Sequence, residues 1–510
     1  YERSRYSSAY SIVDRLGTSV GPRCGLCSCC PSSWGSHKAG YPYLVTPVGR
    51  RRTQGGHVAA IDRAALERAI SRESETYRAR TPKSREMFEA ADHLLGRVPM
   101  TWMNKWSGGY PIHFETARGN RITDVDGHEY IDFALGDTGA MAGHSPAATV
   151  RAVRDRIDDA GGITTMLPTG DGEWVAADLA RRFGLPLWSL SLTATDANRW
   201  ALRIARLVTG RDKICSFSYC YHGAVDETLV RTGPNGSTIE REGNVGPAVP
   251  VAQTTRVAEF NDLASVESAL SHGDVAVLIA EPALTNIGIV LPDPGFWESV
   301  RELCDRYGTL LLIDETHTIS AGPGGCTTAW NLSPDIVVIG KSIGGGVPSG
   351  AYGITEEIAE RINDHPEADL IDVGGVGGTL AGNVLSTSAM RATLGEVLTD
   401  AAFEHMIALA TRFREGVEKV LSDTQVPWSV AQLGARVEYR FVDPPPRTGT
   451  ESAQAHDEEL EVYLHLFMAN RGVLMTPFHN MALMCPTTTE VDVNRHTELF
   501  AEAVTGIVAS

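Results

Sequence analysis

The segment LLLIDETHTISAGPGG, residues 310–325, joins four consecutive aliphatic residues to two carboxylates, Asp314 and Glu315. A short apolar run bounded by turn residues is typical of a strand buried on both faces. A hydrophobic core has no use for a carboxylate at such a strand end. Either the two side chains are solvated or cap a helix there, or they serve a ligand site.

Other apolar runs have the same character: KICSFSY (213–219), VAVLIAEP (275–282) and IVVIGK (336–341). They alternate with helical segments such as PGFWESVRELCDRYG (294–308). Buried strands alternating with helices predict a mostly parallel sheet with right-handed crossovers. In such sheets, ligands bind beyond the carboxyl ends of the strands.

The flanking sequence has a different pattern. Residues 62–96 are helical in periodicity, and residues 113–134 alternate around the turn DVDG, which indicates a β-meander. After about residue 390, we expect a long helix (403–421), a strand (437–442) and a helix (457–470). No internal repeat is visible.

We therefore predict an α/β protein with a large, mostly parallel domain at about 150–394. A small α+β domain would be built from both chain ends, 58–149 and 395–510. Residues 1–57 are rich in Ser, Gly, Pro and Arg and lack periodicity, which predicts a disordered tail. The tail contains CGLCSCC (24–30), but no second CxxC or paired His follows at finger spacing, so we expect no metal site.

Composition narrows the functional classes. The 510 residues are 43% hydrophobic and 21% charged, which is ordinary for a globular protein, and the net charge is −18. A negative field disfavours binding to nucleic acid or to an anionic membrane. No apolar run approaches the length of a membrane span, and the first residues lack an apolar signal-peptide core. Cytoplasmic localisation is the expectation.

Three charged side chains follow apolar runs at strand ends: Glu281, Asp314 and Lys341. The lysine precedes a glycine-rich stretch, GKSIGGG, which suggests a phosphate-binding lysine or a Schiff-base lysine. The phosphate-loop pattern fails because Asp335 stands where its first glycine is needed. A lysine that forms a covalent link to an aldehyde cofactor fits better.

Such a cofactor, pyridoxal 5′-phosphate, makes three physical demands. Its ring nitrogen needs a carboxylate, which Asp314 supplies. Its phosphate needs backbone N–H groups at a helix start, which the Thr193, Ala194 and Thr195 segment offers before a helical stretch. Its ring needs a flat partner, and Tyr221 of YHG is available.

From about residue 85 onward, the chain resembles the class III aminotransferases of PLP fold type I. It is most similar to the branch with glutamate-1-semialdehyde aminomutase and the β-amino-acid and amine transaminases. The order and spacing of the matching stretches carry the resemblance: TDVDGHEYIDF, TATDANRWALRIARLVTGR, YHG, IAEP, LLIDE, VIGKSIGGGVPSGAYG and GGTLAGN.

The resemblance implies roles for five residues. Lys341 would form the Schiff base, Asp314 would pair with the ring nitrogen, and Tyr221 would stack on the ring. Thr379 of GGTLAGN would bind the phosphate across a homodimer interface. His317 falls where relatives place a group near the cofactor's phenolic oxygen, although a packed loop histidine is the alternative.

Glu281 would either line the site or cap its strand. The chain also departs from the family pattern. TATDA stands where relatives usually have SGTEA, and THTISAGPGG replaces an apolar residue and a GFGR-like turn. Many relatives carry a C-terminal arginine for a substrate carboxylate, but LMTPFHNMALMCP (474–486) has none.

These features predict amino-group transfer from a hydrophobic amine or amino acid to an oxo-acid. The expected substrate pocket holds Trp102, Trp106 and Phe478, because aromatic side chains favour apolar groups. Lys105 and Arg436 are candidates to bind the carboxylate of the acceptor. An intramolecular aminomutase and a β-amino-acid aminotransferase remain alternatives. A non-catalytic interaction protein is a different class, disfavoured by the Lys341–Asp314 pair.

Overall fold

The computed structural model describes residues 60–163, 165–370 and 373–509. The predictions for residues 1–57, including the cysteine cluster CGLCSCC, lie outside this range. Within it, five cysteines are buried free thiols: Cys215, Cys220, Cys304, Cys326 and Cys485. The described residues contain no group of side chains arranged to hold a metal ion. No described helix combines the length and apolar character of a membrane span.

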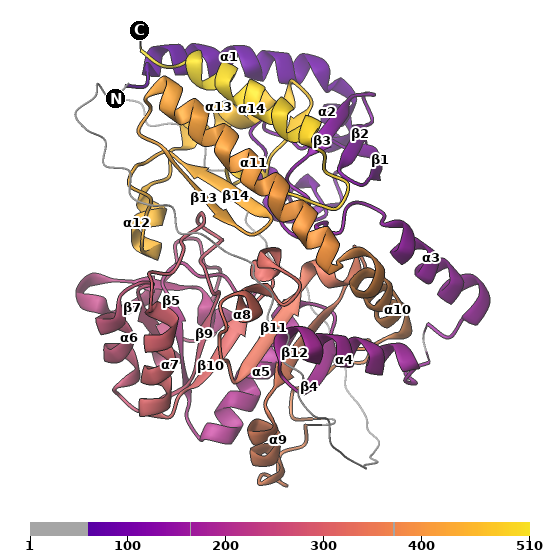
Figure 1. Ribbon diagram of the computed structural model, residues 1–510, viewed down its shortest axis with the longest axis vertical. Helices are drawn as coiled ribbons and strands as arrows, with labels where there is room; N and C mark the ends of the chain where they lie inside the picture. The colour runs from indigo at the N-terminus through magenta and orange to yellow at the C-terminus, as the bar shows by residue number, and fades with distance from the viewer. Residues whose placement is uncertain (1–59, 164, 371–372, 510) are drawn as a thin grey trace.

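A seven-stranded sheet forms the centre of the larger part of the molecule (Figure 1). Its strand order is β4-β12-β11-β10-β9-β5-β8. Neighbours from β11 to β8 are parallel, and β12 runs antiparallel to both β11 and β4. The predicted mostly parallel sheet is confirmed. The strands are β4 (Leu187–Ser191), β5 (Lys213–Phe217), β8 (Thr255–Ala258), β9 (Val275–Ala280), β10 (Leu310–Asp314), β11 (Ile336–Gly340) and β12 (Gly350–Ile354).

Helices bury both faces of this sheet, which explains the continuous apolar runs. Along β10, Leu311 and Ile313 pack in the core beside α6 and α7, whereas Leu310 and Leu312 pack on the opposite face beside α5. Successive residues of a strand point to opposite faces of the sheet. When helices cover both faces, every side chain of the strand is buried, so the strand can be apolar throughout. The helices of this part are α3 (Ala147–Asp155), α4 (Gly170–Phe183), α5 (Ala194–Thr209), α6 (Leu263–Leu270), α7 (Phe296–Tyr307), α8 (Gly325–Ala329), α9 (Glu356–Asn363) and α10 (Val384–Ala392). The hairpin β6 (Val230–Thr232) and β7 (Thr238–Glu240) stands beside β8.

The smaller part is built from both chain ends, as predicted. Strand β15 adds in parallel to β3, and a bridge joins Ile61 to Val508. Arg471 also pairs with the buried Glu73, with Nη1 2.9 Å from Oε2. The N-terminal elements are α1 (Arg63–Arg80), α2 (Pro82–Glu89), β1 (Phe114–Arg118), β2 (Arg121–Asp124) and β3 (Glu129–Asp132). The C-terminal elements are α11 (Asp400–Thr424), β13 (Ser429–Leu433), β14 (Arg436–Arg440), α12 (Gly449–Gln454), α13 (Glu458–Ala469), β15 (Val473–Leu474), β16 (Met481–Leu483) and α14 (Glu490–Thr505).

The first predicted helical segment is in fact two helices. The chain breaks between α1 and α2 because Pro82 lacks an N–H and disfavours a helical conformation at the residue before it. The Thr81 hydroxyl donates to the Tyr77 carbonyl at 2.7 Å and so satisfies the end of α1. Helix α2 ends at Glu89, so residues 90–96 do not continue it.

Candidate active site

The two carboxylates at the end of β10, Asp314 and Glu315, point in different directions. Glu315 is fully buried and accepts hydrogen bonds from the Cys326 N–H at 3.1 Å and the Thr327 N–H at 2.5 Å. It therefore caps the start of α8. Gly325 has a φ of +57°, and a Cβ there would lie 2.3 Å from Glu315 Oε2, so the glycine-rich turn gives this carboxylate its space. Asp314 faces the other way.

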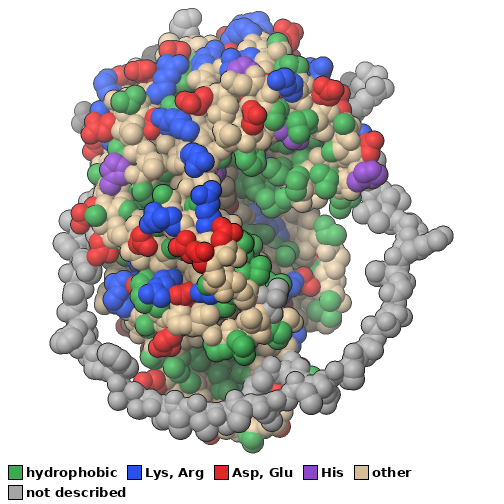
Figure 2. All heavy atoms as spheres, turned by 90° about the vertical axis from the view of Figure 1, so that its right-hand side faces the viewer, with side chains coloured by type: hydrophobic (Ala, Val, Ile, Leu, Met, Phe, Trp, Pro, Cys, Tyr) green, Lys and Arg blue, Asp and Glu red, His purple; other side chains and the backbone are tan. Residues whose placement is uncertain are grey.

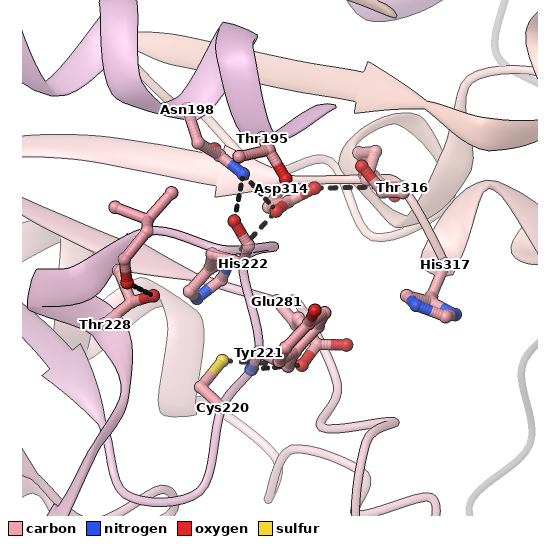
Figure 3. A network of polar contacts seen from close by, with 12 residues as sticks. Thr195, Asn198, Cys220, Tyr221, His222, Thr228, Glu281, Asp314, Thr316 and His317 are labelled. Carbon is pink, nitrogen blue, oxygen red and sulfur yellow. Dashed lines mark hydrogen bonds and ion pairs between the residues drawn. The ribbon is translucent and has the colours of Figure 1, made fainter. Parts of the chain in front are cut away.

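Asp314 is held in a buried network of neutral and basic donors (Figure 3). Its Oδ2 accepts from Asn198 Nδ2 at 2.8 Å and contacts His222 Nδ1 at 2.9 Å, and its Oδ1 accepts from the Thr316 N–H at 3.1 Å. Burial acts to raise the pKa of Asp314, but these hydrogen bonds, led by His222, hold it below its usual range. The site keeps Asp314 as a carboxylate.

His222 and Asn198 were missed in the sequence analysis, although both lie within quoted motifs. Burial acts to lower the pKa of His222, but the Cys220 sulfur and the Asp314 carboxylate raise it well above the usual value. The only sequence signal for His222 was its position directly after Tyr221 in YHG. Nothing in the local pattern showed that the α5 side chain Asn198 would reach Asp314, 116 positions away.

The predicted phosphate-binding segment is the start of α5. Thr193 is its N-cap, with Oγ1 accepting from the Asp196 N–H at 3.1 Å. Glycines allow two strand ends to press against this helix start. A Cβ at Gly340 would lie 2.9 Å from the Ala194 Cβ, and one at Gly350 would lie 2.7 Å from the Thr193 carbonyl carbon. The N–H groups of a helix start attract a phosphate, and this one lies beside the strand end that carries Lys341.

Gly223 of YHG lets the aromatic turn close on the same helix start. Its φ is +78°, and a Cβ there would lie 2.0 Å from Thr195 Oγ1. That hydroxyl also accepts from the Ala224 N–H at 3.2 Å. Any larger residue at position 223 must therefore displace the start of α5 or the Tyr221 turn.

We predict that Gly223→Ala weakens pyridoxal phosphate binding at least about tenfold, or about 1.4 kcal/mol. The substitution adds a steric clash to the strain of a left-handed backbone, itself worth about 1–2 kcal/mol. Titration of cofactor-free protein by visible absorbance measures the effect. Gly236→Ala is the control, because Gly236 has a φ of +74° with open space around its Cβ position. Equal cofactor affinity in the two variants would contradict the clash.

Tyr221 and Glu281 lie together (Figure 3). Glu281 is buried and accepts from the Tyr221 N–H at 3.4 Å, from Cys220 Sγ at 3.4 Å and from the Thr285 hydroxyl. Burial raises the pKa of Glu281. The Tyr221 side chain is the exposed member of this group, at 37%. Glu281 thus supports the backbone that presents the Tyr221 ring.

Lys341 lies in a second polar cluster that joins both parts of the molecule. Its Nζ is 2.6 Å from His317 Nε2 and 3.3 Å from Asp137 Oδ2. On the other side of the ring, His317 Nδ1 is 3.0 Å from Arg436 Nη2 and 3.1 Å from Thr138 Oγ1. Arg436 also donates to Thr138. Sequence analysis named His317 and Arg436 as candidates but missed Asp137.

Electrostatics in this cluster are strong because its members are buried. Burial acts to raise the pKa of Asp137, but the basic groups around it, led by Lys341 and His317, hold it well below its usual range. Burial also lowers the pKa of His317 well below its usual value, with Lys341 and Arg436 acting in the same direction. The ring of His317 is therefore neutral, and Asp137 is ionised.

The residues predicted to line the substrate pocket separate into two environments. Trp102 and Phe478 form an edge-to-face pair with centroids 5.1 Å apart, and Lys105 Nζ lies 5.8 Å from the Phe478 ring centre. Trp106 instead packs against the buried cluster around Tyr77 and Tyr110. Figure 2 shows hydrophobic side chains gathered around a hollow on one face of the molecule. Thr379 is exposed on this chain.

Comparison with known proteins agrees with this geometry. A model of the family "Aminotransferase class-III" matches residues 102–504. The chain is 30% identical over 425 residues to glutamate-1-semialdehyde 2,1-aminomutase of Anaeromyxobacter sp. (strain K), covering 82% of this chain and 96% of the relative. It is 33% identical over 392 residues to glutamate-1-semialdehyde 2,1-aminomutase 2 of Halalkalibacterium halodurans, covering 75% and 88%.

Solved structures extend the comparison. A glutamate-1-semialdehyde-aminomutase from Pseudomonas aeruginosa PAO1 superposes with a TM-score of 0.84 at 46% identity, covering 88% of this chain and 99% of the other. An omega-transaminase from Sphaerobacter thermophilus has a TM-score of 0.74 at 26% identity, covering 83% and 97%. The chain belongs to the class III aminotransferase family. It is a pyridoxal phosphate-dependent enzyme of fold type I, and the predictions of family, fold and cofactor are confirmed.

Proposed function

We propose that this enzyme transfers an amino group between an amine that carries an apolar group and an oxo-acid acceptor. Bound pyridoxal phosphate supplies an aldehyde for attachment of the amine and a ring that withdraws electrons. Lys341 holds the cofactor covalently and, once displaced, moves a proton at the substrate carbon through its Nζ. Its position at the carboxyl end of β11, beside the start of α5, supports both roles.

The other site residues hold and orient the cofactor in this proposal. Asp314 keeps the ring nitrogen protonated, because a buried ionised carboxylate favours a cationic neighbour. The N–H groups of Thr193, Ala194 and Thr195 bind the phosphate. The Tyr221 ring packs on the cofactor ring, with Glu281 fixing its backbone.

The observation that carries the substrate proposal is the pair formed by Trp102 and Phe478, with Lys105 above the Phe478 ring. Aromatic faces favour an apolar donor. Arg436 is only 1% exposed and already contacts Thr138 and His317. We therefore assign the acceptor carboxylate to Lys105 rather than to Arg436.

We expect an arylalkylamine to react with kcat/KM at least as high as its α-carboxylated analogue or β-phenylalanine. A desolvated carboxylate needs a charged partner, whereas the apolar amine needs only the aromatic pair. Steady-state kinetics with each donor and a common oxo-acid measure this. Lys105→Met should raise KM for the acceptor without changing KM for the amine. If either amino acid is preferred by more than about tenfold, or about 1.4 kcal/mol, the enzyme is an amino-acid aminotransferase.

A second candidate is an intramolecular aminomutase, favoured by the 46% identity to the Pseudomonas aeruginosa glutamate-1-semialdehyde-aminomutase. The two functions differ in one product. Transamination releases the carbonyl compound derived from the donor and consumes an oxo-acid. An aminomutase isomerises glutamate-1-semialdehyde without an acceptor and releases no ketone, so product analysis with and without the oxo-acid separates them.

We also propose that the active enzyme is a homodimer in which Thr379 binds the phosphate of the neighbouring cofactor. Thr379 is exposed on the single chain, and so are the nearby Val373 and Leu380, at 60% and 52%. Exposed apolar side chains next to a polar ligand residue favour burial against a partner. Full activity of a species that sizes as a monomer at low concentration would refute this proposal.

A further inference from the structure

Arg241, which directly follows β7, forms no ion pair with any described residue. Its backbone is fixed, because its N–H donates to the Leu229 carbonyl at 3.0 Å. Its guanidinium has only two hydrogen bonds to the described chain, both from Nη1 at 3.5 Å, to the Tyr219 and Cys220 carbonyls. These distances are long for N–H···O hydrogen bonds. Arg241 is therefore a cation whose partner is not found within the described residues.

The acidic residues beside Arg241 in the chain do not supply this partner. Glu242 pairs instead with Arg231, with Oε1 2.6 Å from Nε, and accepts a hydrogen bond from the Tyr219 hydroxyl at 3.3 Å. Glu240 and Glu242 are exposed, whereas Arg241 is half-buried. The segment after β7 thus leaves its two acids in solvent and partly buries its cation.

The guanidinium of Arg241 lies against the turn that presents Tyr221. Its Cζ is 5.5 Å from the centre of the Tyr219 ring, and its two carbonyl contacts are to the residues directly before Tyr221. Burial raises the pKa of Tyr221, while the charge of Arg241 acts to lower it and that of Asp137 acts to raise it. The side chain of Tyr221 is therefore close to Arg241 and to the acid that pairs with Lys341.

One edge of this guanidinium is free to bind a ligand. Its Nε and Nη2 have no hydrogen bond to the described residues, and neither is among the polar atoms that the described chain seals from solvent. A guanidinium holds its N–H donors in one plane and binds a carboxylate through two parallel hydrogen bonds. Burial of a cation without a partner is unfavourable, so an anionic ligand at this edge is stabilised.

We propose that Arg241 binds a second carboxylate of the acceptor, so that the preferred acceptor is a dicarboxylic oxo-acid. Lys105 precedes β1 and Arg241 follows β7, and each cation binds one carboxylate. The inference rests on the proposed function, because it concerns the acceptor of the amino group. It makes Arg241 a residue that determines specificity and gives it no part in proton transfer.

Glu281 does not take the place of such a ligand. It is the described carboxylate whose charge opposes the effect of burial, which lowers the pKa of Arg241. Its oxygens, however, accept from the Tyr221 N–H, the Cys220 thiol and the Thr285 hydroxyl. Glu281 therefore favours the charged form of Arg241 from a distance and leaves the Nε and Nη2 edge unoccupied.

Calorimetric titration of the full-length, pyridoxal phosphate-loaded enzyme with unreactive acids tests the proposal without turnover. Glutarate has a carboxylate at each end, whereas pentanoate has the same chain length and only one. We expect glutarate to bind at least about tenfold more tightly. Arg241→Met should weaken glutarate binding by the same factor and leave pentanoate binding unchanged. Equal affinities in the wild-type enzyme overturn the proposal, and this comparison requires no variant.

The second readout is the half-reaction of the pyridoxamine 5′-phosphate-loaded enzyme with an oxo-acid, which is independent of the donor. The oxo-acid gains the amino group, and visible absorbance follows the return of pyridoxal phosphate. 2-Oxoglutarate should react at least about tenfold faster than 2-oxopentanoate at low concentration, and Arg241→Met should remove this preference. Arg256→Met is the control, because Arg256 on β8 is held by Asp274 through hydrogen bonds of 2.6 and 2.7 Å.

Failure of the proposed function gives a different result. If the pyridoxamine 5′-phosphate-loaded enzyme reacts with no oxo-acid, the proposed function is removed, and the inference with it. Reaction with oxo-acids without a preference for the dicarboxylic one, or with a preference that Arg241→Met keeps, removes the inference alone. If Arg241→Met weakens pyridoxal phosphate binding and leaves the acceptor preference unchanged, Arg241 serves the cofactor or the Tyr221 turn, and the proposal is overturned.

Discussion

Replacing Lys341 with alanine is expected to lower kcat by roughly four orders of magnitude or more, about 5.5 kcal/mol of transition-state stabilisation. Two functions are lost at once: the covalent link to the cofactor and the amine that transfers a proton at the substrate carbon. The remaining contacts to phosphate and ring still bind the cofactor. Initial rates with an amine donor and an oxo-acid measure the loss.

Lys213→Ala is the matched control. Lys213 begins β5 in the same sheet and pairs with Asp274 at 3.6 Å, at the opposite end of its strand from the site. This variant should keep its activity. The Lys341→Ala protein should also lose the visible band that borohydride bleaches in wild type. Turnover within about tenfold of wild type would remove Lys341 from the chemistry.

Asp314→Asn is expected to reduce kcat by two to four orders of magnitude, roughly 3 to 5.5 kcal/mol, while Asp314→Glu is expected to cost less. Asparagine has nearly the shape of aspartate and can still accept a hydrogen bond from Asn198, but it has no charge to keep the ring nitrogen protonated. A neutral ring withdraws electrons less strongly. Single-turnover rates with excess amine measure this step without an acceptor.

Glu315→Gln is the control at the neighbouring position, because it should affect folding stability and not catalysis. Glu315 accepts from the start of α8 and contacts no proposed cofactor residue. An amide places N–H groups against these donors, so Tm should fall while kcat of the folded fraction is kept. If Asp314→Asn retains more than about a tenth of the wild-type activity, Asp314 is not the partner of the ring nitrogen.

The adjacent residues Asp314 and Glu315 show what the local sequence pattern can and cannot predict. Successive residues of a strand point in opposite directions, so Asp314 and Glu315 had to diverge. Which of them faces the cofactor site depends on what packs on each side. The glycine-rich turn folds α8 back onto Glu315, and α5 brings Asn198 to Asp314. The approach of α5 is not encoded within the segment 310–325.

Trp102 and Trp106, both predicted to line the substrate pocket, are a second example. The sequence predicts two aromatic residues near the mouth of the pocket. Only one pairs with Phe478, whereas the other packs under α13 in the cluster with Tyr77 and Leu466. Trp102 lies within the 3-10 helix Thr101–Lys105, and Trp106 follows it in an extended conformation. The sequence of so short an element does not predict in which direction each ring points.

The sequence by itself determined the parallel sheet and the placement of Asp314 and Lys341 at strand ends, because apolar runs, helix periodicity and glycine-rich turns are local signals. Tertiary structure decided the partners of those two residues. Asp137 lies 204 positions from Lys341, and Arg436 lies 119 positions from His317. Such contacts arise only when β14 and the loop after β3 pack over the strand ends. The polar contacts of Lys341 therefore depend on side chains that no local pattern connects to it.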